Sequence, residues 1–340
     1  KANSTLDIGL YSYPPSATDR GEAFTAGIGK TNNYVNSYRA AIKAMTDPMI
    51  SRVNILAVPG QRDAFVTDYA LSRLSDYGRA IYLMDIPSYT SNSERIFDND
   101  GKRPDTEATR EKFQSRGTDN SFSAVYYPDI SLRDTDTGRV VACPSSIAAL
   151  SALGFNDSIS YPWFAPAGFN RAALNDVVNV SVRLNKADRD DLYDAKINPV
   201  ASFPGAGFVI FGQKTLQQAR SALDRVNVRR MLLEVKRLVE NVASNYVFEQ
   251  NTPTTRSKFV SQITPLLATI QSQQGVDQFK VTMDETNNTQ ADIEANKLNG
   301  QIRIVPTRAV EFIAIDFIIA NSGVSLLLHH RQARLVFLPE

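Results

Sequence analysis

Histidine and cysteine, the side chains that most often carry out catalysis near neutral pH, are scarce in this chain of 340 residues. The two histidines, His329 and His330, are adjacent and lie close to the end of the sequence, and the single cysteine is Cys143. A Ser-His-Asp or Cys-His arrangement needs a histidine that the fold can place beside the nucleophile. We therefore expect no catalytic residues, and we interpret Cys143 and the nearby Ser145 as structural.

The glycine-rich segments do not match a nucleotide site. Gly205-Ala206-Gly207 precedes an apolar run instead of following one, and it lacks a third glycine in register. Pro59-Gly60 ends an apolar run, but no Gly-Lys-Ser/Thr of a phosphate loop follows it. The sequence therefore predicts no nucleotide cofactor.

One acidic segment resembles a calcium loop only in part. Four residues occupy places that such a loop would need: Asp98, Asp100, Gly101 and Glu107. Ile96 takes the first ligand position and Pro104 interrupts the loop, so we interpret the segment as a solvated turn and expect no metal. The single cysteine also excludes an internal disulfide framework and a Cys-rich zinc site.

The charge balance gives no general attraction to polyanions. Lys and Arg number 37 against 36 Asp and Glu, so no global field draws the chain to nucleic acid or to an anionic membrane. No uninterrupted apolar run approaches the ~20 residues of a membrane helix, since Glu311 and Asp316 interrupt the run over 310–320. We expect no direct nucleic-acid contact and no membrane insertion.

The first clear elements form a βαβ unit. An apolar run over 53–58, a helical pattern over 65–74 and a second apolar run over 80–84 are typical of parallel strands joined by a helix. Residues 88–121 are polar without a period, and we interpret them as a surface excursion. Strands predicted at 124–127 and 139–143 would continue the sheet.

The second half predicts a long amphipathic helix and further strands. Apolar residues recur at spacings of three and four from Val226 to Val247, so one face of this helix must pack on protein. A helical pattern over 259–270 follows, and strands are predicted at 207–211, 279–283, 302–305 and 310–319. Both faces of the last strand are apolar, which suits a central strand or one that a neighbouring subunit covers.

These elements predict an α/β fold of mixed α+β type, with a βαβ-containing mixed sheet, flanking helices and a polar surface excursion. We divide the chain into 1–50, assigned to a surface domain; 51–150, an α/β region with the excursion 88–121; 151–325, a C-terminal core; and 326–340, an atypical tail. An origin outside the natural sequence is one interpretation of that tail. No secretory signal precedes the folded pattern, so we expect an internal piece of a longer protein.

Taken in order, these segments resemble the tail sheath proteins of contractile phage tails and related injection machines, over about residues 50–320. The most specific motifs are Ile197-Asn198-Pro199, Phe203-Pro204-Gly205-Ala206-Gly207, the segment from Phe211 to Leu216, and Val226-Asn227-Val228-Arg229-Arg230. Pro59-Gly60 with Asp85-Ile86-Pro87, and the loop Ala165-Pro166-Ala167-Gly168, also resemble family motifs. The excursion 88–121 and the segment after Leu326 match no motif of the family.

The resemblance implies a structural subunit and not an enzyme. Copies would assemble as hexameric rings stacked in a helical sheath around an inner tube, and rigid-body contraction would drive the tube through the host envelope. The implied partners are other copies of the chain, the inner tail tube protein, the baseplate and the tail terminator. The implied location is the virion tail, assembled in the host cytoplasm.

In the family, chain termini add strands to a neighbour's sheet. Candidate contacts with other subunits or with the tube are six residues: Arg229, Arg230, Lys280, Asn287, Phe312 and Phe317. The two arginines would face a partner's carboxylates or pair within the chain, and the lysine and asparagine would lie near the tube. The two phenylalanines belong to the two-faced strand, our candidate for the extended sheet.

Three alternatives remain at this point. The chain is a sheath-like subunit of a secretion or toxin-injection machine, an α/β enzyme whose motif is not visible, or the carrier of a receptor-binding decoration in 88–121. A piece without its terminal arms is expected to stay monomeric, and scattering that showed long polymers would contradict this.

Overall fold

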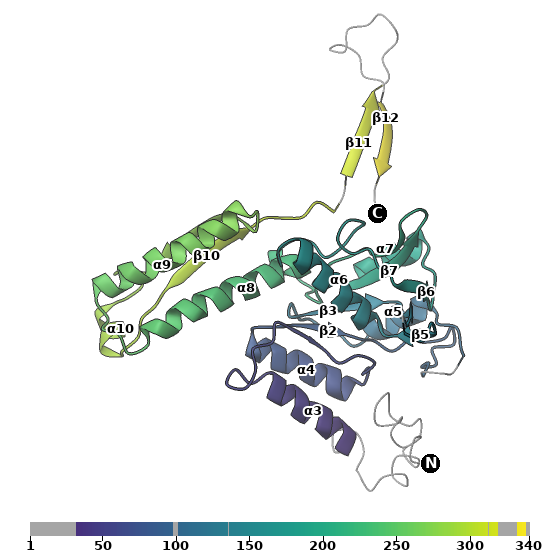
Figure 1. The fold of residues 1–340 in the computed structure, drawn as a ribbon, viewed down its shortest axis with the longest axis horizontal. Coiled ribbons are helices and arrows are strands. Elements are labelled where there is room, and N and C mark those ends of the chain that lie inside the picture. The colour runs from purple at the N-terminus through teal and green to yellow at the C-terminus, as the bar shows by residue number, and fades with distance from the viewer. Residues whose placement is uncertain (1–31, 98–100, 135, 312, 319–331, 338–340) are drawn as a thin grey trace, which may run out of the picture.

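The computed structural model describes residues 32–97, 101–134, 136–311, 313–318 and 332–337 (Figure 1). A five-stranded sheet in the order β1-β2-β3-β7-β8 forms its centre. The strands are β1 (Ile55–Ala57), β2 (Ile81–Met84), β3 (Ser123–Tyr127), β7 (Ile197–Phe203) and β8 (Gly207–Ile210). The first four are parallel and β8 returns antiparallel to β7, so the sheet is mixed and draws strands from both 51–150 and 151–325.

Helices cover both faces of this sheet. One face packs on α4 (Ala64–Tyr77), α5 (Thr106–Gln114) and α7 (Lys186–Asp194), with α3 (Asn33–Met45) against α4. The other face packs on α6 (Ser145–Ile159) and on the first half of α8 (Val226–Ala243). The predicted βαβ unit is confirmed as β1-α4-β2, and the mixed sheet flanked by helices is confirmed as the fold class.

Local signals set the helix ends. The Asp63 side chain accepts a hydrogen bond from the Phe65 N–H at 2.7 Å, which caps the start of α4. Gly78 ends α4 with φ 59°, a left-handed conformation that glycine adopts without steric cost. In α7 Asn185 and Asp188 form a reciprocal capping box.

The prediction that the strand over 139–143 continues the main sheet was wrong. It forms β5 (Val140–Cys143), which pairs with β4 (Ile130–Arg133) in a separate sheet of order β5-β4-β6, with β6 at Val177–Val180. Because β5 lies at an edge of this small sheet, Val140 and Val141 stay exposed. The apolar residues of 139–143 therefore belong to an exposed edge strand and not to a buried strand of the main sheet.

The polar segment 88–121 is not only a surface loop. It contains α5, whose N-terminus is capped by Asp105 and whose Ala108, Thr109 and Phe113 are buried. Charged residues fill the solvent face of this short helix, and they hid its single buried stripe from a search for apolar periodicity. The segment therefore contributes a helix to the core.

The chain after β8 builds an elongated arm (Figure 1). Its elements are η2 (Ala222–Asp224), α8, η3 (Ser244–Tyr246), α9 (Pro253–Ser272), β9 (Val276–Thr282), α10 (Gln290–Glu294) and β10 (Gln301–Pro306). β9 and β10 form an antiparallel pair, and with α8 and α9 they enclose a separate apolar core. The predicted long helix and the strands at 279–283 and 302–305 are confirmed.

Trp163 joins the body to this arm. Its indole N–H donates to the Gln273 carbonyl at 2.9 Å, at the end of α9. Gly275 lies directly against the ring, because a Cβ at this position would sit 3.0 Å from Trp163 atoms and 2.7 Å from Ile270 Cγ2. Only glycine fits at this contact without displacement.

The C-terminal hairpin consists of β11 (Ile313–Ile318) and β12 (Gln332–Phe337), an antiparallel pair that forms a sheet of its own. The alternative that 310–319 is a central strand of the main sheet was therefore wrong, and Val310 is exposed outside the strand. The tail 326–340 contains a strand with a defined partner, which the sequence did not indicate. It pairs with the preceding strand β11, and no periodic pattern of its own marks it.

Candidate assembly site

The edge where α/β sheets usually bind ligands is filled by a side chain of the protein itself. Asp85 follows β2 at the carboxyl end of the sheet and is 1% exposed. Its carboxylate accepts from the backbone N–H of Gly60 and of Ser146, both at 2.9 Å, and from the Ser146 hydroxyl at 2.7 Å. The Ser145 hydroxyl adds a longer contact of 3.3 Å.

These donors are the groups that would bind an anionic ligand in a related architecture. Ser145 and Ser146 open α6, and the N-terminus of a helix attracts negative charge. In open α/β sheets, ligands bind in the crevice outside the carboxyl ends of the strands. Here Asp85 takes that place and links the turn after β1 to α6.

Next to Asp85, an ion pair covers the same edge. Arg62 lies 2.6 Å from the Asp129 carboxylate, and Asp129 also accepts from the Ser145 N–H at 3.2 Å. No group of three or more His, Cys, Asp or Glu side chains that could hold a metal ion occurs among the residues the structure describes. The contacts of Asp85, Arg62 and Asp129 can hold the turn after β1 against the start of α6.

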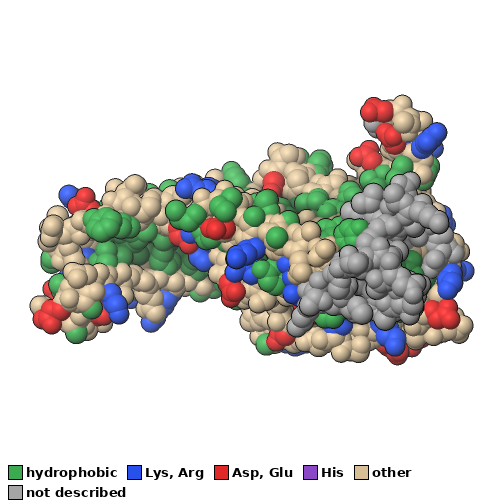
Figure 2. Space-filling view, turned by 90° about the horizontal axis from the view of Figure 1, so that it is seen from below, with side chains coloured by type: hydrophobic (Ala, Val, Ile, Leu, Met, Phe, Trp, Pro, Cys, Tyr) green, Lys and Arg blue, Asp and Glu red, His purple; other side chains and the backbone are tan. Residues whose placement is uncertain are grey.

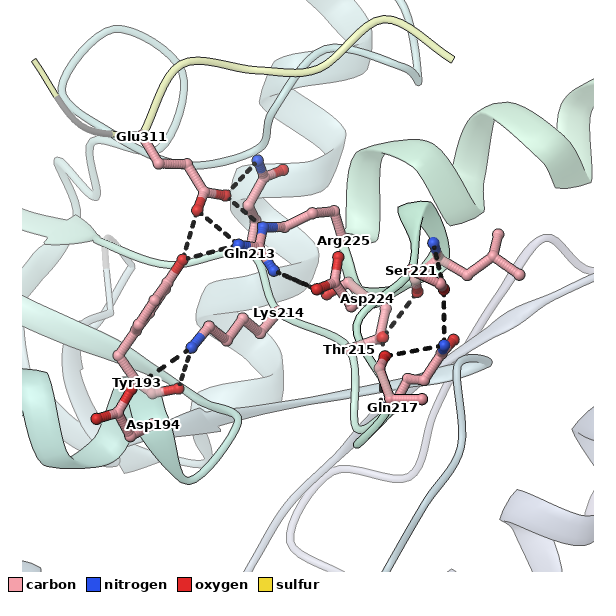
Figure 3. A network of polar contacts seen from close by, with 12 residues as sticks. Tyr193, Asp194, Gln213, Lys214, Thr215, Gln217, Ser221, Asp224, Arg225 and Glu311 are labelled. Carbon is pink, nitrogen blue, oxygen red and sulfur yellow. Dashed lines mark hydrogen bonds and ion pairs between the residues drawn. The ribbon is translucent and has the colours of Figure 1, made fainter. Parts of the chain in front are cut away.

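A second polar cluster lies where the chain enters the C-terminal hairpin (Figure 3). We call Tyr193, Gln213, Lys214, Arg225 and Glu311 the root cluster. Glu311 comes from the segment before β11, Arg225 is the residue before α8, and Tyr193 lies in α7. The cluster thus brings together the starts of the arm and of the hairpin on one side of the body.

Glu311 is the acceptor at the centre of the root cluster. Its Oε1 accepts from Arg225 Nε at 2.6 Å and from Gln213 Nε2 at 3.2 Å, and its Oε2 accepts from Arg225 Nη2 at 2.9 Å and from the Tyr193 hydroxyl at 2.5 Å. The Glu311 side chain is 19% exposed and that of Arg225 is 25% exposed. Both carboxylate oxygens are therefore used, in the bidentate geometry that Arg favours.

The surroundings stabilise the charged forms of this pair. Burial alone raises the pKa of Glu311, but hydrogen bonds from Arg225 and Tyr193 outweigh it and hold the pKa below its usual value. Burial likewise lowers the pKa of Arg225, and the contact with Glu311 more than offsets this, so the net pKa is raised. The pair is ionised throughout the neutral range.

Lys214 completes the cluster on the side of α7. Its ammonium group donates to the Tyr193 carbonyl at 2.7 Å and lies 3.3 Å from the centre of the Tyr193 ring. Burial, followed by the nearby charge of Lys196, lowers the pKa of Lys214 to about 8. Without Glu311, cationic groups would dominate this cluster.

The two candidate arginines on α8 make contacts within the chain. Arg230 is buried and forms a bidentate pair with Asp157 of α6, at 3.0 and 2.5 Å. Arg229 donates to the Ser121 carbonyl at 3.1 Å and lies over the Phe122 ring, and burial lowers its pKa to about 10. The alternative of intrachain contacts is thus realised for both, and a contact with a partner stays a prediction.

The other candidate contacts lie apart from the arginines. Lys280 is exposed on β9, and Asn287 lies in the loop after β9, where its side chain donates to the Thr282 carbonyl at 2.9 Å. Phe317 lies in β11 opposite Ala333, and Phe312 lies outside the described residues. Their roles as contacts stay predictions, and the structure does not bring the described candidates Arg229, Lys280 and Asn287 into one site.

Sequence reasoning missed the root cluster. Glu311 was noticed only because it interrupts an apolar run, and Arg225 precedes the motif that begins at Val226. The only signal for this cluster in the sequence was a carboxylate just before an apolar strand. Its partners Tyr193 and Gln213 lie about a hundred residues earlier in the chain.

The arm matches a known family. Residues 218–320 match the phage tail sheath C-terminal domain, a range that includes η2, α8 to α10 and β9 to β11.

None of the helices in the described ranges is both long and apolar enough to cross a lipid bilayer.

Curated relatives agree with this match. The chain is 41% identical over 187 residues to the tail sheath protein of Vibrio phage KVP40 and 33% identical over 188 residues to that of Enterobacteria phage T4. Each alignment covers 55% of this chain and 28% of the relative. The aligned part of the chain therefore spans little more than a quarter of the length of these relatives.

The fold also has a solved counterpart. The helical sheath of the anti-feeding prophage in its contracted state superposes with a TM-score of 0.62 at 21% identity, covering 93% of this chain and 81% of that one. The common architecture therefore includes the body as well as the arm. Residues 218–320 match the phage tail sheath C-terminal domain, and the resemblance of this chain to phage tail sheath proteins is confirmed.

Proposed function

We infer that this chain is the core of a structural subunit that polymerises into a contractile tail sheath. The observation that carries the inference is the match of residues 218–320 to the sheath C-terminal domain, which contains the arm and ends in the region of the hairpin. The body supports it, because the crevice in which an α/β enzyme would bind a ligand holds Asp85. The subunit is proposed to be structural and not an enzyme.

The hairpin is the proposed site of strand addition. β11 and β12 pair with each other and with no further strand among those described, so each has an outer edge for another chain. Main-chain hydrogen bonds across such an edge hold two chains together with little demand on side chains. Strands exchanged between neighbours would link subunits into a mesh that survives while the bodies move as rigid units.

Apolar surfaces on the body and arm suit a protein that is covered by neighbours. The outer side of α6 exposes Leu150, Phe155 and Ile159, and Phe248 at the end of the arm is fully exposed. Figure 2 shows hydrophobic side chains gathered along the arm. Exposed apolar patches of this kind mark interaction sites.

The proposed partners follow from the sheath role. They are other copies of the chain in stacked hexameric rings, the inner tail tube protein, the baseplate and the tail terminator, with the assembled form in the virion tail and assembly in the host cytoplasm. Lys280 and Asn287 remain the proposed contacts with the tube, and residues 1–50 are proposed to belong to a surface domain. A sheath of a toxin-injection machine is the alternative, and the high identity to phage sheath proteins favours the phage tail.

Electron microscopy of the full-length protein tests the proposal. We expect tubular polymers from the wild type, and short or no tubes from Val336→Pro, because proline in β12 removes a main-chain donor and disturbs strand pairing. The matched control, Val336→Thr, keeps the β-branched shape and is expected to form tubes. Globular particles from the wild type at every concentration and salt condition would exclude the sheath role.

A further inference from the structure

We propose that Glu311 is the anchor that fixes the direction in which the C-terminal hairpin leaves the body, so that its edges are presented to a neighbour at a set position. The proposal rests on the sheath role for its biological meaning. Its physical content concerns this chain alone, and it assigns to Glu311 a positioning function that no sequence motif indicates.

The chain before Glu311 offers the hairpin little support. β10 ends at Pro306, and the N–H of Thr307 donates to the Gly275 carbonyl at the long distance of 3.3 Å. Residues 307–310 are exposed, Val310 by 77%. The arm therefore does not hold the hairpin through this linker, and the next fixed point is Glu311.

Glu311 holds the chain to three separate elements at once. Its partners come from α7 (Tyr193), from the segment after β8 (Gln213) and from the start of α8 (Arg225). Because β11 begins two residues after Glu311, a fixed Glu311 places the start of the hairpin close to the start of α8. The Glu311 carboxylate thus connects the body, the start of the arm and the start of the hairpin.

The geometry distinguishes this contact from an ordinary surface ion pair. Exposed pairs contribute little because water and salt screen them and the side chains lose freedom. Here four donors converge on a carboxylate that is 19% exposed, and two of them belong to one guanidinium. Loss of the charge would leave Arg225 with the Asp224 carboxylate at 3.1 Å and the Tyr193 hydroxyl at 3.3 Å.

The isosteric change Glu311→Gln tests the anchor. An amide cannot accept from all four donors, since its nitrogen would face either Arg225 Nε or Arg225 Nη2. Loss of one hydrogen bond to a charged group should raise the population of molecules in which residue 311 is detached from the root cluster by about ten- to hundredfold. The body should stay folded, because its apolar cores do not include Glu311.

The single cysteine makes the direction of the hairpin measurable. A spin label on Cys143 in β5 and a second on Arg334→Cys in β12 report the distance between body and hairpin by double electron-electron resonance. We expect one narrow distance distribution with Glu311 and an added broad component with Glu311→Gln. Arg225→Lys, which keeps the charge but loses the fork, should give a smaller broad component.

The matched control is Glu234→Gln. Glu234 also pairs with an arginine, Arg237, but on the surface of α8 one turn apart, and this change should leave the distribution unchanged. If the distance distribution of Glu311→Gln is the same as those of the wild type and of Glu234→Gln, the proposed positioning role of Glu311 is overturned. A general loss of fold, seen by circular dichroism in Glu311→Gln and Arg225→Lys alike, would also overturn it, because the role would then be stability and not position.

Polymerisation separates the anchor from the sheath role. If the full-length wild type forms tubes, Glu311→Gln should reduce their length or regularity, and tubes identical to the wild type would refute the positioning function while leaving the sheath role intact. If the wild type forms no tubes, the sheath role fails. The distance measurement on the single chain then still decides whether Glu311 orients the hairpin.

Discussion

Replacing Asp85 by asparagine should destabilise the body strongly although the two side chains have the same shape. Each carboxylate oxygen receives one backbone N–H, from Gly60 on Oδ2 and from Ser146 on Oδ1. In either orientation the asparagine NH2 group would face one of these donors. One buried N–H loses its acceptor, and the remaining bonds lose the charge that strengthens them.

The structure gives the size of this effect. An unsatisfied buried donor costs about 1–3 kcal/mol, and a hydrogen bond to a charged group contributes about 1.5–3 kcal/mol, so we expect Asp85→Asn to lower the free energy of unfolding by about 2–4 kcal/mol. Asp85 is 1% exposed, so water cannot replace the lost acceptor. A change of this size lowers the ratio of folded to unfolded protein by a factor of about 30 to 700.

Urea denaturation, followed by Trp163 fluorescence and by circular dichroism, measures the change. The matched control is Asp76→Asn on the exposed side of α4, which should shift the free energy of unfolding by less than about 0.5 kcal/mol. If Asp85→Asn unfolds at the same urea concentration as Asp76→Asn, the carboxylate does not hold the crevice together and the argument is refuted.

Three further predictions concern packing and charge. Gly275→Ala should destabilise by about 1–3 kcal/mol because its Cβ has no room, whereas Gly154→Ala inside α6, with nothing within 4 Å, should be neutral or stabilise by up to about 1 kcal/mol; equal denaturation midpoints would contradict this. Asp157→Asn should lower the free energy of unfolding more than Arg230→Met does. The first change leaves the Arg230 side chain, 5% exposed, without its counter-charge, whereas the second leaves the Asp157 carboxylate, which is 33% exposed and can be hydrated; a larger loss for Arg230→Met in urea denaturation would contradict this. Since the folded pKa of Glu311 is lowered, its contacts are complete at neutral pH and are lost as pH falls through that pKa, so the broad distance component of the wild type should grow on acidification and approach that of Glu311→Gln; a difference between the two that is independent of pH would disprove the assignment.

The elements with strong local patterns were predictable. The βαβ unit has two apolar runs around an amphipathic helix, and α8 has one apolar face over five turns, so burial and local sequence agree. The helix α5 was missed because its buried stripe holds only a few residues among charged ones. β12 was missed because an isolated hairpin strand has no core to impose a pattern.

The polar clusters were not predictable, since they depend on long-range contacts. Tyr193 and Glu311 are separated by 118 residues, and Asp85 and Ser146 by 61. Each of these side chains alone is typical of a surface or a turn. The motif Asp85-Ile86-Pro87 entered through resemblance, and the structure supplies its physical reason: the carboxylate holds the start of α6 and the turn at Gly60.

Asp85 also bears on how the particle responds to its surroundings. A carboxylate attached to the chain and held within hydrogen-bond distance has a very high effective concentration at the crevice, so dissolved phosphate or nucleotide competes poorly for the same donors. Asp85 would thus shield this edge from such ligands, in contrast to α/β proteins that bind them there. In the proposed sheath, each subunit would keep the same body whatever the concentration of phosphate or nucleotide around it.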